Sequence, residues 1–385
     1  MRNKEAFAGA APRQTGLQTL VAVVSCLLTI GLLWVMLGAS AGEAAAVQAN
    51  TQVMDKFDMH VTDQVSRILD GVIPIRRVYQ LSDSDLAAPK PDPACFGQAE
   101  DPAQLQWLLD QAAPLLEGQA TLFTTETPIK EGSQVHYYLD DTIFAVTWKQ
   151  PLGDCVYTFS EVRIAHASQM RRFFSEGRFD SGVLHTTTEM SQSVNAVVAA
   201  SGDYYGYRSI GIVVNGGQVY RDRGHFLDTC YIDDQGDLLF TYAGQITDRA
   251  AAEAYVKEQN IRFSLSFGPV MILDGRCCVP DTYNSGEIND HYARAALCQM
   301  DKLHYVVVAA NSEDPYFSVP TVEEFARQLE HMGIPTAYAL DGGQTAAIVM
   351  GDALINTVSY GAQREISDIF YFATALPEKK QEVEG

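Results

Sequence analysis

The sequence predicts an α+β fold, in which a mixed β-sheet core with packed helices follows a single N-terminal transmembrane helix and a smaller α+β region. Short apolar runs that end in Gly, Asn or Asp alternate with stretches whose apolar residues recur at helical spacing. One apolar stretch near the N-terminus is long enough to cross a bilayer. The 385 residues also suffice for a substantial hydrophobic core.

The charge balance argues against a nucleic-acid partner. The chain has 48 acidic and 27 basic residues, which gives a formal net charge of −21. Binding to a phosphate backbone depends on clustered Lys and Arg, which an acidic chain does not favour. Acidity at this level otherwise indicates solubility and does not specify a function.

The N-terminal apolar stretch predicts a cell-membrane protein with one span. Residues 1–16 would be cytoplasmic and residues 17–38 a transmembrane signal anchor, since no charged residue lies between Arg13 and Glu43. About 21 residues at ~1.5 Å each span a bilayer core of ~30 Å. Basic residues precede the span and acidic residues follow it, which places the bulk of the chain outside the cell. A signal peptide cleaved near residues 39–41 is the alternative, although its apolar region would exceed the usual ~7–15 residues.

Two segments are expected between the span and the main domain. Apolar residues at helical spacing predict a juxtamembrane helix or stalk over residues 43–78. Residues 80–180 are expected to form a small extracytoplasmic α+β region. Its predicted parts are a polar linker (80–100), a helix from Asp101-Pro102 to Leu116, β-rich stretches at 136–148 and 156–165, and a short helix at 170–174.

Residues 186–376 are expected to form the main domain, before an acidic tail at 377–385. Two capping boxes, Thr186 with Glu189 and Thr321 with Glu324, open predicted helices. The first helix would bury Met190, Val194, Val197 and Val198 and end at Ser201, and the second would end at Gly333. Hairpins are predicted at Asn215-Gly216, 233–237 and Gly351-Asp352, with a helix at 247–259 and a final strand at 369–373. Strand 303–309, the second helix and strand 336–340 predict a parallel crossover unit.

The sequence gives no firm metal or disulfide assignment. The acidic turn at 233–237 lacks the remaining ligands of a calcium loop. No cofactor is expected, and a divalent ion bound by acidic turns stays open as an alternative. The cysteines follow no spacing that selects a pairing.

The turn after residues 336–340 is the strongest local indication of a site. Asp341 follows the predicted strand, and Gly342-Gly343 allows a sharp bend that exposes backbone N–H groups around a carboxylate. Ligands in open α/β sheets commonly bind at the carboxyl ends of strands. An ordinary turn with a capping Asp is the alternative.

Several motifs resemble the phosphodiester glycosidase family over roughly residues 190–375. The run Ala-Leu-Asp341-Gly-Gly-Gln-Thr345 resembles its Leu-Asp-Gly-Gly-Gly-Ser signature. The run Ser201-Gly-Asp203-Tyr-Tyr205 resembles its Asn-Gly-Gly-Phe-Phe motif, and Phe267-Gly-Pro resembles its Ser-Gly-Pro strand. The Arg-x-Ala core at Arg294 and the Arg-Glu-Ile-Ser-Asp run at 364–368 also resemble family motifs.

The resemblance implies hydrolysis of a sugar joined through its anomeric carbon to a phosphodiester. Such chemistry needs a cation for the phosphate, a carboxylate for the oxocarbenium-like transition state, and groups that bind hydroxyls. The implied catalytic residues are Asp341 near the anomeric centre, Arg294 on the phosphate, and Asp203 as a second carboxylate. A structural ion pair is the alternative for Arg294. The implied substrate-binding residues are Gly202, Asn311, Gly342, Gly343, Gln344, Thr345 and Arg364.

Two departures from the family keep alternative functions open. Ala310-Asn311-Ser312 stands where the family often has Asp-Gly-Arg, and Gln344 replaces a Gly. The favoured function is a membrane-anchored, extracytoplasmic glycosidase that cleaves an N-acetylglucosamine-1-phosphodiester-like bond in envelope or exogenous glycans. The alternatives are a non-catalytic glycan- or phosphoglycan-binding protein on the same fold, and an envelope assembly module formed by the stalk and residues 80–180. Common serine-hydrolase, nucleotide-binding and zinc-protease motifs are absent from the sequence.

Overall fold

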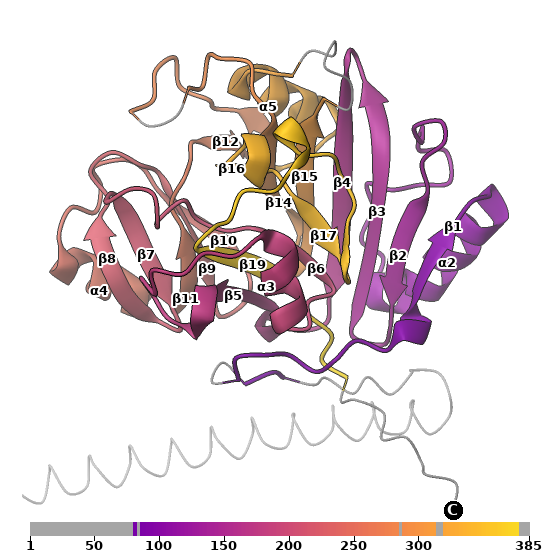
Figure 1. Cartoon of the computed structure of the whole chain (residues 1–385), viewed down its shortest axis with the longest axis horizontal. Coiled ribbons are helices and arrows are strands. Elements are labelled where there is room, and N and C mark those ends of the chain that lie inside the picture. Colours follow the sequence, from indigo (N-terminus) through magenta and orange to yellow (C-terminus); the bar gives the residue numbers. More distant parts are fainter. Residues whose placement is uncertain (1–79, 83–84, 285–286, 313–318, 377–385) are drawn as a thin grey trace, which may run out of the picture. The chain divides into compact units, whose positions relative to one another are not determined.

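A nine-stranded sheet forms the centre of the structure (Figure 1). The structure is a computed structural model, and it describes residues 80–82, 85–284, 287–312 and 319–376. Neighbouring strands in this sheet are antiparallel throughout. In spatial order the strands are β1 (Phe96–Ala99), β2 (Val135–Leu139), β3 (Ile143–Leu152), β4 (Cys155–Ile164), β15 (His304–Asn311), β14 (Arg294–Asp301), β16 (Thr336–Leu340), β12 (Val270–Leu273) and β13 (Arg276–Cys277).

Two five-stranded sheets accompany the central one. The first comprises β10 (Leu238–Thr241), β9 (Thr229–Asp233), β11 (Ile261–Leu265), β7 (Gly211–Asn215) and β8 (Gln218–Arg223). The second comprises β18 (Ala353–Leu354), β17 (Ile348–Met350), β6 (Val198–Ser201), β19 (Asp368–Phe372) and β5 (Met170–Phe174). The predicted hairpins at 215–216, 233–237 and 351–352 are confirmed by the pairs β7–β8, β9–β10 and β17–β18.

The helices begin where the sequence predicts. They are α2 (Pro102–Leu116), α3 (Thr187–Ser193), α4 (Arg249–Glu258) and α5 (Val322–His331). The Asp101 carboxylate accepts hydrogen bonds from the N–H groups of Ala103 and Gln104, which caps α2. Both predicted capping boxes are formed, at the starts of α3 and α5.

Both faces of the central sheet are buried. On β15, Val306, Val308 and Ala310 pack into a core that includes residues of α2 and α5, whereas alternate residues of the same strand pack against the smaller sheets. This alternation follows from the two-residue repeat of a strand. A strand covered on both sides needs apolar residues at every position, which explains the continuous apolar run of β15.

The structure corrects several predicted elements. Residues 170–174 form β5 and not a helix, because they pair with Asp368–Phe372 along the whole of β19. Helix α3 ends at Ser193, and Val198 belongs to β6 because Asn195, at φ 58°, turns the chain out of the helix. The predicted linker 80–100 contains β1.

Two further differences concern connections. Strands β15 and β16 run in the same direction, but β14 lies between them and is antiparallel to both, so they do not form an adjacent parallel pair. Strand β4 pairs with β15 from Arg163–His304 to Val156–Asn311. The central sheet therefore runs across the predicted division between residues 80–180 and 186–376.

Some predictions lie outside the described residues. These are the cytoplasmic segment, the membrane span, the stalk at 43–78 and the acidic tail. Within the described ranges, no helix is long and apolar enough to cross a membrane. Cys155, Cys230 and Cys298 are buried with free thiols, as expected of small apolar residues.

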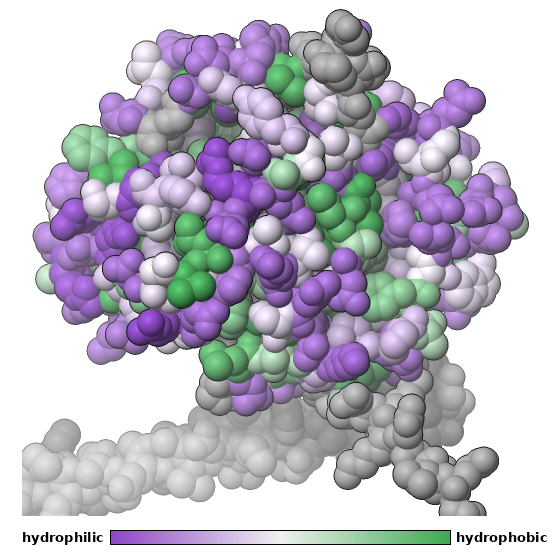
Figure 2. Space-filling view, viewed as in Figure 1, coloured by the Kyte–Doolittle hydropathy of each residue, from purple (hydrophilic) through white to green (hydrophobic). Residues whose placement is uncertain are grey.

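The visible surface is mainly hydrophilic, and its hydrophobic areas are small and separate (Figure 2). This surface agrees with the strongly acidic composition. Among the large apolar side chains that are exposed, Tyr207, Tyr292 and Tyr360 belong to segments at or next to the cavity described below.

Candidate functional site

A cavity of about 380 Å³ lies where strand β16 ends. It is lined by the loop after β6, the β11–β12 connection, the segment before β14, the start of α5 and the β16 end. Its charged and aromatic lining residues are Tyr204, Arg208, Phe267, Glu287, Tyr292, Arg294, Phe325, Asp341 and Arg364. Segments distant in sequence thus bring two carboxylates and three guanidinium groups to one cavity.

The turn after β16 has the geometry that the sequence predicts. A Cβ atom on Gly342 would lie 2.1 Å from the carbonyl oxygen of Ala293, so this position accepts only glycine. Gly343 has φ 65°, and its N–H donates to the same oxygen at 2.9 Å. These contacts fix the turn against the segment before β14 and direct Asp341 to the cavity.

The Asp341 carboxyl group is incompletely bonded. Its Oδ2 atom is buried and has no hydrogen-bond partner among the described residues. Burial raises the pKa of Asp341, while the Thr345 side chain and the positive charges of Arg364 and Arg208 oppose this rise. A buried carboxyl oxygen without a partner inside a cavity indicates a binding or catalytic position.

Arg208 is a cavity residue that the sequence analysis missed. Its Nη2 donates to the Ser266 carbonyl at 3.2 Å. Its guanidinium carbon lies 4.6 Å from the centre of the Phe267 ring and 5.3 Å from that of Tyr204. These aromatic rings hold the cation by cation–π interactions beside Asp341. The sequence feature that could have indicated Arg208 is its position three residues after the Ser-Gly-Asp-Tyr-Tyr run, which resembles a family motif.

Arg364 lines the same cavity, as predicted. Its guanidinium lies 6.0 Å from the ring centres of Tyr204 and Tyr207, which stack on each other at 4.8 Å. The Arg364 N–H donates to the Gln344 carbonyl at 3.3 Å, and the Gln344 side chain donates to the Ala362 carbonyl at 3.1 Å. Gln344 therefore positions Arg364 and does not line the cavity itself.

Arg294 also lines the cavity, but backbone carbonyls occupy much of its guanidinium. Nε donates to Pro320 O at 3.1 Å, and Nη2 donates to the carbonyls of Glu287 (2.9 Å) and Asp290. Burial lowers the pKa of Arg294. A structural ion pair was the predicted alternative for Arg294, but the hydrogen bonds of its guanidinium go to backbone carbonyls. They make Arg294 an anchor for the cavity wall, and a poorer phosphate ligand than Arg208 or Arg364.

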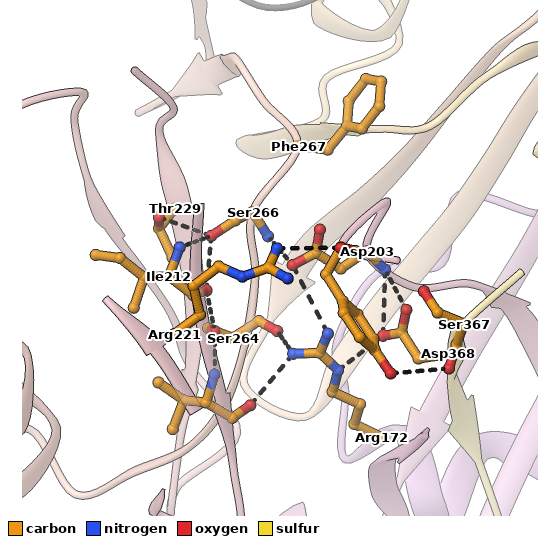
Figure 3. Close-up of polar contacts among 12 residues, drawn as sticks. Arg172, Asp203, Ile212, Arg221, Thr229, Ser264, Ser266, Phe267, Ser367 and Asp368 are labelled. Atoms are coloured by element: carbon orange, nitrogen blue, oxygen red, sulfur yellow. Dashed lines mark hydrogen bonds and ion pairs between the residues drawn. The ribbon is translucent and has the colours of Figure 1, made fainter. Parts of the chain in front are cut away.

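Asp203 and Gly202 do not line the cavity, and Figure 3 shows Asp203 beside Arg172 and Ser266. The Asp203 carboxylate is buried, accepts the Ser266 N–H at 3.0 Å, and lies 3.7 Å from Arg172. A Cβ atom on Gly202 would lie 2.3 Å from Asp368 Oδ2, so the glycine is explained by close packing. The second carboxylate of the cavity lining is Glu287 and not Asp203. Glu287 lies near the Arg294 motif, but no residue pattern distinguished it.

Asn311 and Thr345 have structural contacts outside the cavity lining. The buried Asn311 Oδ1 accepts a hydrogen bond from Asn356 Nδ2 at 2.8 Å. Thr345 Oγ1 donates to the Gly342 carbonyl at 2.7 Å and supports the turn. The run that stands where the family often has Asp-Gly-Arg therefore contributes a buried amide pair through Asn311. No three His, Cys, Asp or Glu side chains within the described ranges are grouped to hold a metal ion.

Comparison with known proteins decides the family. Residues 193–373 match the family model of the phosphodiester glycosidases. This segment is a phosphodiester glycosidase domain. The resemblance predicted from the sequence is confirmed, and every cavity-lining residue from Tyr204 to Arg364 lies within the matched range. A search of curated proteins found no match.

A solved structure shares the fold of this chain. The zebrafish N-acetylglucosamine-1-phosphodiester alpha-N-acetylglucosaminidase catalytic domain, auto-inhibited by its pro-peptide, is 14% identical with a TM-score of 0.52. The match covers 68% of this chain and 92% of the zebrafish one. A hypothetical Synechocystis protein is 13% identical with a TM-score of 0.44, and its match covers 64% of this chain and 65% of its own.

Proposed function

We propose that this protein is a membrane-anchored glycosidase that hydrolyses a sugar-1-phosphodiester of the N-acetylglucosamine-1-phosphodiester type in envelope or exogenous glycans. One observation carries the proposal. The Asp341 carboxyl group, with one unbonded oxygen, shares a cavity with Arg208 and Arg364. The name of the zebrafish enzyme supports this substrate class, and the family match supports the reaction type.

The two arginines supply the phosphate-binding charge. Both act on Asp341 electrostatically, so a phosphodiester between them would lie next to that carboxylate. Guanidinium groups bind phosphate oxygens through paired hydrogen bonds. As the sugar–oxygen bond breaks, negative charge grows on the departing phosphate monoester, and a fixed cation stabilises it. Arg208 thus supplies a cation to the cavity, whereas the run Ala310-Asn311-Ser312 lacks the arginine of the family's Asp-Gly-Arg motif.

The Asp341 carboxylate acts at the anomeric carbon. The bond from this carbon to the phosphate oxygen breaks with its electron pair going to the phosphate, and water forms the new carbon–oxygen bond. Asp341 stabilises positive charge on the sugar and accepts the proton of the attacking water, a task that a raised pKa favours. A phosphate monoester is a weak base, so the leaving group needs little protonation.

The test is hydrolysis by the purified full chain. The substrates are α-linked N-acetylglucosamine, glucose and galactose 1-phosphodiesters, and the readout is release of free sugar. Turnover of at least one substrate, lost in Asp341→Asn with the fold intact, is the expected result. Turnover that persists in Asp341→Asn contradicts the site. The absence of turnover on every substrate contradicts the reaction.

Membrane anchoring rests on the apolar stretch at 17–38 and the basic residues before it. The expected result is that the chain sediments with membranes and that external protease removes its C-terminal part from intact cells. Recovery of the intact chain in the soluble fraction contradicts the anchor.

Non-catalytic binding of a phosphoglycan is the second candidate function. The run Ala310-Asn311-Ser312 favours it, because it stands where the family often has Asp-Gly-Arg and lacks the cation of that motif. Saturable binding of sugar-1-phosphodiesters without turnover would identify this function.

A further inference from the structure

Three charged side chains, Arg172, Asp203 and Asp368, form a sealed cluster next to Ser266 (Figure 3). Arg172 Nε donates to Asp368 Oδ2 at 2.7 Å, and its Nη2 lies 3.7 Å from Asp203 Oδ2. The exposed fractions of the Arg172, Asp203 and Asp368 side chains are 0%, 1% and 0%. Such burial of charges is costly unless the groups are paired and well bonded.

The sheet topology brings the three residues together. Strand β19 lies between β5 and β6, so Asp368 at its start is close to Arg172 on one side and to the end of β6 on the other. The Asp203 N–H donates to Asp368 Oδ1 at 3.0 Å. Arg172 lies on β5, outside the segment that matches the family, so the cluster depends on a residue from the preceding region.

Arg172 also ties two sheets together. Its Nη1 donates to the carbonyls of Val214 on β7 and Ser264 on β11, while its Nε reaches β19. Its guanidinium lies 4.8 Å from the centre of the Phe174 ring. The planar fork of arginine permits these simultaneous bonds, and a lysine ammonium cannot reproduce them.

One residue connects the cluster to the cavity. The Ser266 N–H donates to Asp203 Oδ2 at 3.0 Å, and the Ser266 carbonyl accepts from Arg208 Nη2 at 3.2 Å. Phe267, the next residue, supplies the ring under the Arg208 guanidinium. Arg221 holds the loop between β6 and β7, which carries Arg208, because it donates to the carbonyls of Tyr205 (3.0 Å) and Arg208 (2.7 Å).

We infer that Arg172, Asp368 and Asp203 are positioning residues that act through Ser266 to hold Arg208 in the phosphate-binding orientation. Asp203 has two functions in this arrangement. It fixes the peptide that orients Arg208, and its charge stabilises the Arg208 cation. The inference rests on the proposed function for the phosphate-binding role of Arg208 and for its kinetic readout.

A double-mutant cycle tests the inference. Asp203→Asn keeps the side-chain size and one oxygen acceptor but removes the charge. We expect it to raise KM for the sugar-1-phosphodiester about tenfold with a smaller change in kcat, and to change KM less than about twofold when added to Arg208→Ala. An equal effect in both backgrounds overturns the inference. Arg172→Lys, expected to raise KM in the same direction, decides the question if Asp203→Asn does not fold.

Amide hydrogen exchange gives a readout that does not depend on turnover. In Asp203→Asn, peptides covering 203–210 and 264–268 are expected to exchange faster, while the β2–β3 hairpin is unchanged. The control is Asp140→Asn, whose carboxylate accepts the N–H groups of Thr142 (2.7 Å) and Ile143 (3.0 Å) away from the cavity lining. It should alter exchange in its own turn and leave KM unchanged. Unaltered exchange at 264–268 in Asp203→Asn contradicts the inference even if the wild type has no turnover.

Discussion

Two clusters of acidic and arginine side chains lie in this protein, and they differ in how completely their carboxylates are bonded. Asp341, at the cavity, has an oxygen with no partner in the described structure, although Arg208 and Arg364 are near. Asp368, in the sealed cluster, accepts bonds from the Arg172 guanidinium and from the Asp203 N–H. The first cluster therefore has a carboxylate oxygen available to a ligand. In the second the carboxylates are bonded within the protein, and the Arg172 Nη2 atom, which has no hydrogen-bond partner in the described structure, faces Asp203 at 3.7 Å.

The difference also separates two uses of arginine. Arg172 donates to a carboxylate and two carbonyls and is fully enclosed. Arg364 contacts aromatic faces at 6.0 Å, which leaves its donor edge available to an anion. Burial alone does not identify a catalytic group, because Asp203 and Asp341 are both buried and both have a raised pKa. The bonding of each oxygen is what distinguishes them.

The largest expected effect would break the comparison at Asp341. Asp341→Asn should lower kcat/KM by about 10²–10⁴-fold, because the amide cannot stabilise positive charge or accept a proton. Its melting temperature should be unchanged or higher, since the substitution removes a buried charge with an unbonded oxygen. Steady-state kinetics and calorimetry measure both. The exposed Asp352→Asn is the control, and equal activity in the two variants would refute the assignment.

The sealed cluster should respond in the opposite way. Arg172→Met leaves two buried carboxylates without their cation and should lower the free energy of unfolding by about 3–5 kcal/mol. Denaturant titration measures the change. Arg327→Met removes an exposed helical pair with Glu323 and should have little effect. A comparable loss in the two variants would show that the cluster is not a structural centre.

Local signals predicted much of the fold. Capping boxes at Thr186 and Thr321 and glycines at the hairpin turns act within a few residues, so the sequence reveals them directly. Residues 170–174 form a strand through pairing with β19, a partner nearly 200 residues away that no local pattern reveals. Tertiary pairing overrode the local preference there.

The site was predictable where the backbone decides the residue type. Gly342 and Gly343 are fixed by a close contact and a positive φ, and they marked Asp341 correctly as a cavity residue. Arg208 and Asp203 were assigned poorly because each role depends on long-range contacts, with Ser266 in both cases. Motif matching identified segments that line the cavity, but it could not distinguish a side chain that faces the cavity from one that is buried beside it.

A pH series sharpens the comparison by titrating the sealed cluster. Burial raises the pKa of Asp368 to about 7, with Arg172 opposing the rise and Asp203 adding to it. The folded state then binds this proton more tightly than the unfolded state, so the contribution of Asp368 to stability is fully present below its ordinary pKa of 3.8 and is lost as the pH rises from there through about 7. The slope is at most about 1.4 kcal/mol per pH unit for one proton. Denaturant titrations of wild type and Asp368→Asn should differ in this slope, and identical slopes would contradict the raised pKa.

The smallest expected effect concerns the aromatic support of the cavity cations. Tyr204 stacks on Tyr207 at 4.8 Å and lies 5.3 Å and 6.0 Å from the guanidinium groups of Arg208 and Arg364. Tyr204→Leu keeps an apolar side chain but removes the ring, so each cation loses an interaction of about 0.5 kcal/mol. KM should rise about three- to tenfold with kcat less affected, because the arginines bind phosphate before and during bond cleavage.

The matched control for that change is Tyr242→Leu, an exposed tyrosine outside the cavity lining. It should leave KM unchanged. A fall in kcat at constant KM in Tyr204→Leu would mean that the ring contacts the reacting sugar, and would move Tyr204 from the phosphate-binding wall to the anomeric centre. An unchanged KM and kcat would mean that Ser266 and Gln344 suffice to orient the two arginines, because these backbone contacts remain when the ring is removed.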